Sequence, residues 1–246
     1  MRILISNDDG YKADGIIQLA KSLSEIAEVI VVAPSENKSA ASSSLTIGKP
    51  LKPIQIEQNI YAIDATPSDC VHLALCGFIK EPIDLVVTGI NFGANLGDDV
   101  IYSGTVAGAI EGRFLGLPSI ALSLASWECK HFETAGNIAR LLVAQIDKAP
   151  LANNTIINVN VPDIPIHEIN GIKSTRLGSR HKSEPSIKDL KDPSLYWIGE
   201  NGKEADNGEG TDFYAISKNF VSVTPLQIDI TKYTEMSALS KWLKDV

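Results

Sequence analysis

The fold is decided at the start of the chain, by the stretch RILISNDDG at residues 2–10. A short apolar run such as residues 3–5 is typical of a strand that is buried on both faces of a parallel sheet. Asp8 and Asp9 then follow the carboxyl end of that strand, where open α/β sheets bind their ligands. Adjacent carboxylates repel each other and lose hydration when buried, so they require full exposure or a compensating cation. This junction therefore predicts a divalent metal held by oxygen ligands.

Further apolar runs alternate with segments of helical periodicity along the first two thirds of the chain. We expect buried strands at 29–33, 60–63, 83–88, 119–123 and 155–161. Hydrophobic residues recur at helical spacing at 16–23, 66–79, 105–115 and 132–146. The helix at Thr66 has a hydroxyl cap, proline in its first turn and an acid three residues after the cap. This β-α alternation predicts an α/β fold with a doubly wound, mostly parallel sheet.

The pattern changes after about residue 164, where the chain becomes polar and irregular. Residues 196–198 form an isolated hydrophobic run, residues 220–224 and 226–230 alternate like exposed strands, and residues 236–243 predict a closing helix. Because Tyr196, Trp197 and Trp242 require burial, an arm that forms an oligomer is favoured over a loose surface loop. We therefore predict one α/β domain over 1–246, with a core at about 1–165 and an arm and C-terminal helix at about 166–246.

Composition excludes several classes of protein. The chain has 246 residues, of which 44% are hydrophobic, and a formal net charge of -8. This charge argues against nucleic-acid binding, which requires a basic surface. No apolar run approaches the ~20 residues of a membrane span, and we expect no signal peptide, because the first strand begins at once. The three cysteines lack C-x-x-C spacing, so we expect a reduced, cytoplasmic protein without disulfides or a zinc-thiolate site.

Four oxygen-bearing residues lie at predicted strand ends or in the loops that follow them: Asp8, Asp9, Ser39 and Asn91. Carboxylate, hydroxyl and amide oxygens suit hard cations such as Mg²⁺, Mn²⁺ or Ca²⁺. Few protein ligands would leave coordination sites for water and a phosphate. The alternatives are an ordinary Asp-Gly turn, a solvated loop serine, and an asparagine that adopts a left-handed turn.

A second group of residues predicts a phosphate site. The segment GINFGANLG at 89–97 is followed by Tyr102-Ser103-Gly104-Thr105, which opens a helix. Glycines allow a close approach of backbone to ligand, and a helix N-terminus offers free N–H groups and the positive end of a dipole. Asn95, Ser103 and Thr105 add polar side chains. The segment matches neither common nucleotide-binding glycine motif, and an irregular turn with Ser103 as a helix cap is the alternative.

Other catalytic signatures are absent from the sequence. There is no G-x-S-x-G elbow and no H-E-x-x-H motif, and the four histidines are scattered. The only concentrated basic segment is residues 175–182, which includes His181. This segment either lies over an anionic substrate or forms a solvent-exposed surface.

Several motifs together resemble those of one family in one order. They are NDDG at 7–10, AP at 33–34 with Ser39, TPSDCV at 66–71, VTGIN at 87–91, GANLGDDV at 93–100, YSGTV at 102–106, EG at 111–112, NVNVP at 158–162, TRLG at 175–178, GTDF at 210–213 and VSVTPL at 221–226. Over nearly its whole length the chain is similar to the SurE (survival protein E) nucleotidases. Ala40 and Asp14 depart from the family pattern, which commonly has glycine and proline there.

This resemblance implies a Rossmann-like core and a cytoplasmic, metal-dependent 5′-nucleotidase. The implied reaction is hydrolysis of nucleoside 5′- and 3′-monophosphates, with short polyphosphate as a further substrate. One divalent ion, Mg²⁺ or Mn²⁺, would be held by Asp8, Asp9, Ser39 and Asn91, with Asp8 and Asp9 as the catalytic pair. The phosphate pocket would comprise Asn95, Ser103, Gly104 and Thr105. The implied partner is a second copy of the chain, in a homodimer or homotetramer, with no nucleic acid and no membrane.

Two mechanisms and two other functions are compatible with these residues. A metal-bound water attacks phosphorus in line with the departing nucleoside, or a free carboxylate forms an aspartyl-phosphate. The alternatives to a phosphatase are a transferase that uses a sugar nucleotide and a non-catalytic nucleotide sensor.

Overall fold

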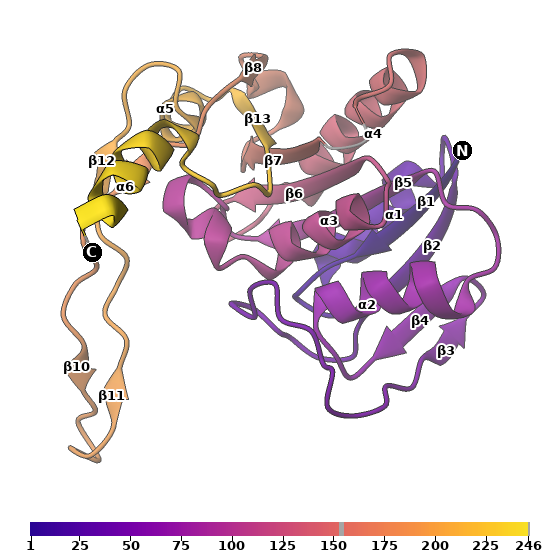
Figure 1. Ribbon diagram of the computed structural model, residues 1–246. Coiled ribbons are helices and arrows are strands. Elements are labelled where there is room, and N and C mark those ends of the chain that lie inside the picture. The colour runs from indigo at the N-terminus through magenta and orange to yellow at the C-terminus, as the bar shows by residue number, and fades with distance from the viewer. Residues whose placement is uncertain (153–154, 246) are drawn as a thin grey trace.

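The computed structural model describes residues 1–152 and 155–245, and one sheet runs through the body of the molecule (Figure 1). Within the described residues this sheet has nine strands. In spatial order they are β3 (Ile54–Glu57), β4 (Ile60–Ile63), β2 (Glu28–Pro34), β1 (Arg2–Ser6), β5 (Leu85–Phe92), β6 (Ser119–Ala125), β7 (Ile156–Pro162), β13 (Val221–Leu226) and β8 (Ile172–Ser174). All neighbours from β4 to β7 are parallel. β3 and β13 are antiparallel to β4 and β7.

Helices cover both faces of the sheet in two pairs. Helix α1 (Asp14–Leu23) packs on α4 (Phe132–Lys148), and α2 (Pro67–Leu73) packs on α3 (Gly104–Phe114). Strand β1 shows that these pairs lie on opposite faces, because Ile3 and Ile5 belong to the hydrophobic cluster of α1 and α4, whereas Leu4 belongs to that of α2. The predicted doubly wound α/β fold is confirmed.

The local sequence explains most of these elements. Ile3, Leu4 and Ile5 are fully buried, as a strand covered on both faces requires. Helix α2 begins with the predicted capping box, in which the Thr66 hydroxyl accepts from the Asp69 N–H at 3.1 Å. The predicted helix at 66–79 is α-helical only to Leu73 and continues as a π-helical segment, η1 (Ala74–Phe78). Strand β3 was not predicted, because it is an exposed edge strand with no buried face.

The row of glycines in α3 allows this helix to pack close to the sheet. Gly104, Gly108 and Gly112 are four residues apart and therefore share one face. A Cβ atom added to Gly108 would lie 2.8 Å from the Thr88 Cγ2, and one added to Gly112 would lie 2.7 Å from the Val86 Cγ2. These distances are too short for real Cβ contacts, so the small residues set the spacing between α3 and β5.

The segment beyond residue 165, which we call the arm, contributes both to the sheet and to projecting structure. Its strands β8 and β13 join the main sheet next to β7, because the alternating Val221 and Val223 pack on the core cluster of α1 and α4. The remaining strands form two antiparallel pairs: β9 (Ser179–Arg180) with β12 (Glu204–Asp206), and β10 (Ile187–Lys188) with β11 (Tyr196–Trp197). The arm also holds α5 (Asp212–Ser217) and α6 (Met236–Trp242). Single-turn segments are η2 (Gly97–Ile101), η3 (Ile166–Glu168), η4 (Tyr233–Glu235) and η5 (Leu243–Asp245).

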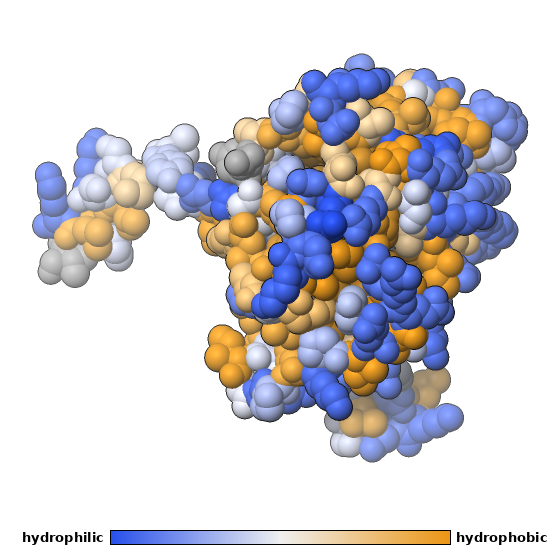
Figure 2. All heavy atoms as spheres, turned by 90° about the vertical axis from the view of Figure 1, so that its right-hand side faces the viewer, coloured by the Kyte–Doolittle hydropathy of each residue, from blue (hydrophilic) through white to orange (hydrophobic). Residues whose placement is uncertain are grey.

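Two parts of the arm stand away from the body. The β10–β11 hairpin hangs below the sheet in Figure 1, and α6 projects to the left in Figure 2 with hydrophobic side chains on it. Tyr196, Trp197 and Trp242 are 62%, 66% and 63% exposed. They are not buried within the single chain, and their burial in an oligomer stays a prediction. Residues 228–230 do not form the predicted strand, because β13 ends at Leu226.

Across the described residues, no helix combines the length and the apolar character that crossing a membrane requires.

Candidate active site

A cavity of about 870 Å³ opens at the carboxyl ends of β1 and β5. Five of the residues singled out in the sequence line it, although they come from segments far apart in the chain: Asp8, Ser39, Asn91, Asn95 and Ser103. Asp9 adjoins the cavity, since the backbone N–H of Phe92, a lining residue, donates to the Asp9 Oδ2 at 3.1 Å. The fold brings these residues together because parallel strands end at the same edge of the sheet.

Asp8 is the most deeply buried acid of this cavity, with 3% of its surface exposed. The pKa of Asp8 is raised from 3.8 to about 6. Burial is the largest cause, the hydrogen bond from Thr105 opposes it, and the neighbouring Asp9 adds a smaller increase. That bond runs from the Thr105 hydroxyl to the Asp8 Oδ1. Burial also raises the pKa of Asp9. The charged forms of these two adjacent acids are both penalised. A cation bound between them would therefore stabilise both carboxylates strongly.

Asn91 is oriented by the glycine-rich loop that follows it. Its Nδ2 donates to the carbonyl oxygen of Gly93 at 2.8 Å, so its Oδ1 is the group left for a ligand. The strand register between β5 and β6 shifts between Thr88 and Asn91, and this irregularity allows the end of β5 to bend toward the cavity. Together with Asp8, this arrangement places carboxylate and amide oxygens on one cavity wall.

The loop that carries Ser39 is exposed but tied down on both sides. The Lys38 N–H donates to the carbonyl oxygen of Asp8 at 2.7 Å. Farther along, Thr46 donates to Asp69 through its N–H at 2.8 Å and its hydroxyl at 2.7 Å. Ala40 has a φ of 61°, in the left-handed region that favours glycine, so the departure from the family pattern puts a strained residue next to Ser39.

The predicted phosphate pocket contains the N-terminus of α3. The Ser103 hydroxyl caps this helix by accepting from the Val106 N–H at 3.1 Å. The N–H groups of Gly104 and Thr105 belong to the first turn, where no helical partner exists for them. The Thr105 hydroxyl is committed to Asp8, so the backbone of Thr105, and not its side chain, is what this residue offers to a phosphate.

Gly104 lies directly against Asp8. A Cβ atom at position 104 would lie 2.8 Å from the Asp8 Cβ and 2.9 Å from its Oδ2. The carboxylate and the helix N-terminus can approach this closely only because position 104 has no side chain. An acid that can hold a cation and a backbone that can hold an anion are thus in contact.

Asn95 is held by a buried polar network that sequence reasoning missed. Its carbonyl oxygen accepts from Asn158 Nδ2 and Asn160 Nδ2, both at 2.9 Å, and its N–H donates to the Asn160 Oδ1 at 2.8 Å. Its side-chain Nδ2 donates to the Ser123 hydroxyl at 2.8 Å. Asn158 and Asn160 are fully buried in β7, and two asparagines at alternate positions of an apolar strand were the available signal.

The family model for "Survival protein SurE" matches residues 3–184. The chain belongs to the SurE family. It is 70% identical to "5'-nucleotidase SurE" of Ruthia magnifica subsp. Calyptogena magnifica over 246 residues, which is 100% of both chains. It is 53% identical to the protein of the same name from Alkalilimnicola ehrlichii, over 99% of this chain and 95% of that one. The crystal structure of the SurE protein from Aquifex aeolicus superposes with a TM-score of 0.89, at 41% identity and 100% coverage of both chains.

Histidines lie away from the cavity in the described part of this SurE chain. His72 pairs with Glu111 at 2.7 Å and His131 with Asp163 at 3.1 Å, both outside the cavity lining. Of the basic segment 175–182, Arg180 lines the cavity, whereas His181 is exposed to solvent. No group of three or more His, Cys, Asp or Glu side chains suited to a metal occurs among the described residues. A metal at this site would therefore need hydroxyl or amide ligands beside its two carboxylates.

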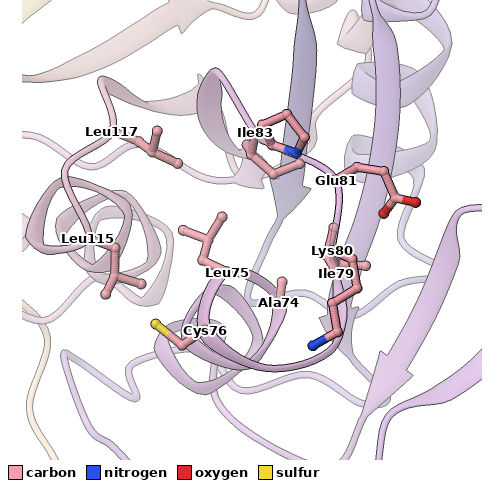
Figure 3. Close-up of a pocket in the computed structure, with 10 residues that line it drawn as sticks. Ala74, Leu75, Cys76, Ile79, Lys80, Glu81, Ile83, Leu115 and Leu117 are labelled. Carbon is pink, nitrogen blue, oxygen red and sulfur yellow. The ribbon is translucent and has the colours of Figure 1, made fainter.

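A second cavity, of about 310 Å³, lies on the other side of the fold. It is lined mainly by apolar residues of η1 and of the segments that precede β5 and β6, including Leu75, Ile83 and Leu117. Figure 3 shows the carboxylate of Glu81 turned away from the leucine side chains. The Lys80 amine turns back to η1, where it donates to the carbonyl oxygen of Gly77 at 2.8 Å. Because this cavity adjoins the amino ends of parallel strands, it lies opposite to the edge where such sheets bind ligands. It offers no chemistry comparable to that of the Asp8 cavity.

Proposed function

We propose that this protein is a 5′-nucleotidase that hydrolyses nucleoside 5′-monophosphates, and also 3′-monophosphates, to a nucleoside and phosphate. The observation that carries this proposal is the contact between Asp8 and the N-terminus of α3 within one cavity. An acid that can hold a metal and a helix end that can hold a phosphate are the two groups that a metal-assisted phosphatase requires. The names of the relatives in the SurE family support the 5′-nucleotidase part of this proposal.

The proposed metal is a single Mg²⁺ or Mn²⁺ ion held by Asp8, Asp9, Ser39 and Asn91. These residues offer oxygen atoms only, which is the chemistry that hard cations prefer. Burial raises the pKa values of Asp8 and Asp9, so a cation bound between them would favour the charged forms that burial penalises. When bound, such an ion polarises a phosphoryl oxygen and lowers the pKa of a water molecule.

The remaining steps are assigned to the protein's own groups. Asp8 lines the cavity, whereas Asp9 is held by the backbone of Phe92, so Asp8 is the carboxylate placed to accept the proton of the attacking water. The N–H groups of Gly104 and Thr105 bind the phosphate oxygens as charge develops on them. Asn95, fixed by Asn158 and Asn160, orients the phosphate. An aspartyl-phosphate on Asp8 is the competing route, and trapping of a phosphorylated enzyme distinguishes it.

The cavity fits a nucleotide in size and in lining. Ligand pockets for small molecules are about 300–1,000 Å³, and this one has about 870 Å³. Three exposed aromatic residues line it: Phe92, Tyr102 and Trp127, which are 44%, 65% and 85% exposed. Exposed rings beside a phosphate site are suited to stacking on a base, so we expect nucleotides to be preferred over simple phosphate esters.

Phosphate release from a panel of nucleoside 5′- and 3′-monophosphates, with short polyphosphate added to the panel, tests this function. We expect turnover of the monophosphates, its loss in a chelator, and its return when Mg²⁺ or Mn²⁺ is restored, because Asp8 and Asp9 cannot polarise a phosphate without the ion. Binding without turnover would instead indicate a nucleotide sensor. Transfer of a group to an acceptor without release of phosphate would indicate a transferase. Activity that survives complete chelation would contradict the proposed metal dependence.

We also propose that the arm mediates assembly into a homodimer or homotetramer. The hairpin and α6 expose large apolar side chains without burying them in the same chain: Leu190, Tyr196, Trp197, Ile198, Leu239 and Trp242. Exposed apolar area of this kind marks protein–protein contacts. Sedimentation velocity measures the assembly state directly.

We also propose a cytoplasmic location. The free thiols of Cys70, Cys76 and Cys129 fit the reducing conditions of that compartment.

A further inference from the structure

Asp212 is a fully buried carboxylate whose partners are backbone N–H groups of three separate segments. Its Oδ2 accepts from the Gly97 N–H at 2.7 Å. Its Oδ1 accepts from the Gly178 N–H at 2.8 Å and from the Phe213 N–H at 2.9 Å. Gly97 belongs to the glycine-rich loop of the core, whereas Gly178 and Asp212 belong to the arm. We call this set of residues the Asp212 clasp.

The clasp requires glycine at both of the positions that it joins. A Cβ atom at Gly97 would lie 2.6 Å from the ring of Phe213, and one at Gly178 would lie 2.5 Å from the same ring. The Gly178 position would also bring a Cβ to 2.3 Å from the carbonyl oxygen of Asp206. Loop and arm can therefore meet around one carboxylate only because neither donor residue has a side chain.

The residues two positions beyond each clasped glycine form one wall of the cavity. Asp99 follows Gly97, Arg180 follows Gly178, and both line the Asp8 cavity. The Arg180 Nη2 and the Asp99 Oδ2 are 2.7 Å apart, and the Arg180 Nε lies 3.0 Å from the same oxygen. Asn201, also a lining residue, donates to the Asp99 Oδ1 at 2.9 Å. This wall is preformed, because Arg180 also lies over the Phe213 ring at 4.9 Å.

The chemistry of this wall suits an uncharged polar group. Arg180 is the only basic residue among the described residues that line the cavity, and Asp99 neutralises it. A second phosphate would meet no free positive charge there, whereas ribose hydroxyl groups can both donate to Asp99 and accept from Arg180. The same cavity is also lined by Asp8 and Asn91, where the proposed function places the phosphate.

We propose that Asp212 is a positioning residue for the nucleoside half of the substrate, because it locks the arm to the glycine-rich loop so that Asp99 and Arg180 face the ribose. This inference rests on the proposed nucleotidase activity. It assigns to the arm a part in substrate selection that is separate from assembly. Asp212 itself touches no substrate.

The test compares two phosphate monoesters in the full-length, metal-loaded protein: a nucleoside 5′-monophosphate and p-nitrophenyl phosphate, which has no ribose. In Asp212→Asn an amide replaces one acceptor oxygen, so at least one clasped N–H loses its partner. We expect kcat/KM for the nucleotide to fall about tenfold to a hundredfold, mainly through KM, as for a displacement of about 1 Å. For p-nitrophenyl phosphate, and for the shift of Tm by Mn²⁺, we expect no change. Asp206→Asn, which breaks the exposed Arg176–Asp206 pair of the same arm, is the matched control.

Arg180→Gln provides a second variant, in which the buried carboxylate and its three N–H partners remain intact. It is expected to lower kcat/KM for the nucleotide and to leave kcat/KM for p-nitrophenyl phosphate unchanged. If Asp212→Asn does not fold, this variant provides the test of the proposed ribose contact. An equal loss on both substrates, or no loss on either, would overturn the inference. A wild-type protein that hydrolyses p-nitrophenyl phosphate but no nucleotide would instead overturn the proposed function.

Discussion

Asp8→Asn is expected to abolish turnover and, at the same time, to stabilise the metal-free protein. If Asp8 holds the proposed metal, its loss removes several kcal/mol of transition-state stabilisation, which corresponds to at least about a thousandfold in rate. The stabilisation arises because Asp8 is buried beside Asp9 without a cation. Asparagine keeps the shape of the side chain and an oxygen that can accept from the Thr105 hydroxyl, but it carries no charge.

The pH dependence of this effect has a definite sign. The pKa of the Asp8 carboxyl is raised from 3.8 to about 6 in the folded chain. Between these two values the folded state binds more protons than the unfolded state, so its stability falls as pH rises, and the penalty is complete above the folded pKa. A shift of about two pKa units corresponds to roughly 3 kcal/mol. The Asn variant lacks this decline.

Urea denaturation in a chelator, at several pH values between 4 and 8, measures the predicted gain. We expect the two proteins to differ little near pH 4 and the variant to be more stable at neutral pH. Asp14→Asn, which removes an exposed acid at the start of α1, is the control and should change neither activity nor this pH dependence. A variant that is less stable than the wild type at pH 7 would show that Asp8 is not penalised by its surroundings.

Gly104→Ala is expected to lower turnover about a hundredfold without removing any polar group. The added methyl group would lie 2.8 Å from the Asp8 Cβ, which is a backbone-proximal atom that cannot move aside freely. Either Asp8 or the first turn of α3 must shift, and a displacement of about 1 Å costs about 10²-fold in rate. Both kcat and the affinity for inorganic phosphate should fall, because the helix N-terminus moves away from the acid.

Steady-state kinetics and phosphate inhibition on this variant check the prediction. Gly77→Ala is the matched control, since a Cβ atom at position 77 meets nothing within 4 Å. Circular dichroism establishes that both variants are folded. Wild-type kinetics in Gly104→Ala would mean that the spacing between Asp8 and α3 is not used in the reaction.

Much of the fold followed from local patterns, because the core elements are covered on one or both faces in a regular way. The apolar run at 3–5 and the capping box at Thr66 both predicted what the structure contains. The arm was less predictable. Its short strands have two or three residues each, too few to show a periodicity, and its aromatic residues lie in solvent in the single chain. Nothing within one chain indicates what such residues pack against.

The candidate site was partly predictable for a related reason. Asp8, Asn91 and Ser39 could be grouped from the sequence, because parallel strands end at one edge of the sheet. The residues that hold the loops in place could not be grouped in this way. Asp69 reaches Thr46 across 23 positions, and Asp212 reaches Gly97 across 115. Contacts between irregular segments so far apart have no periodic signature, so their partners emerge only from the folded chain.

The glycine row of α3 also bears on how wide the substrate range of such an enzyme can become. The close seating of this helix on the sheet fixes the position of its N-terminus relative to Asp8, where we propose that phosphate binds. A larger residue at Gly108 or Gly112 would meet side chains of β5, so a change about one or two turns from Gly104 would shift the helix or the sheet. Evolution toward bulkier phosphate esters would therefore change residues at the far end of this helix as readily as residues that touch the substrate.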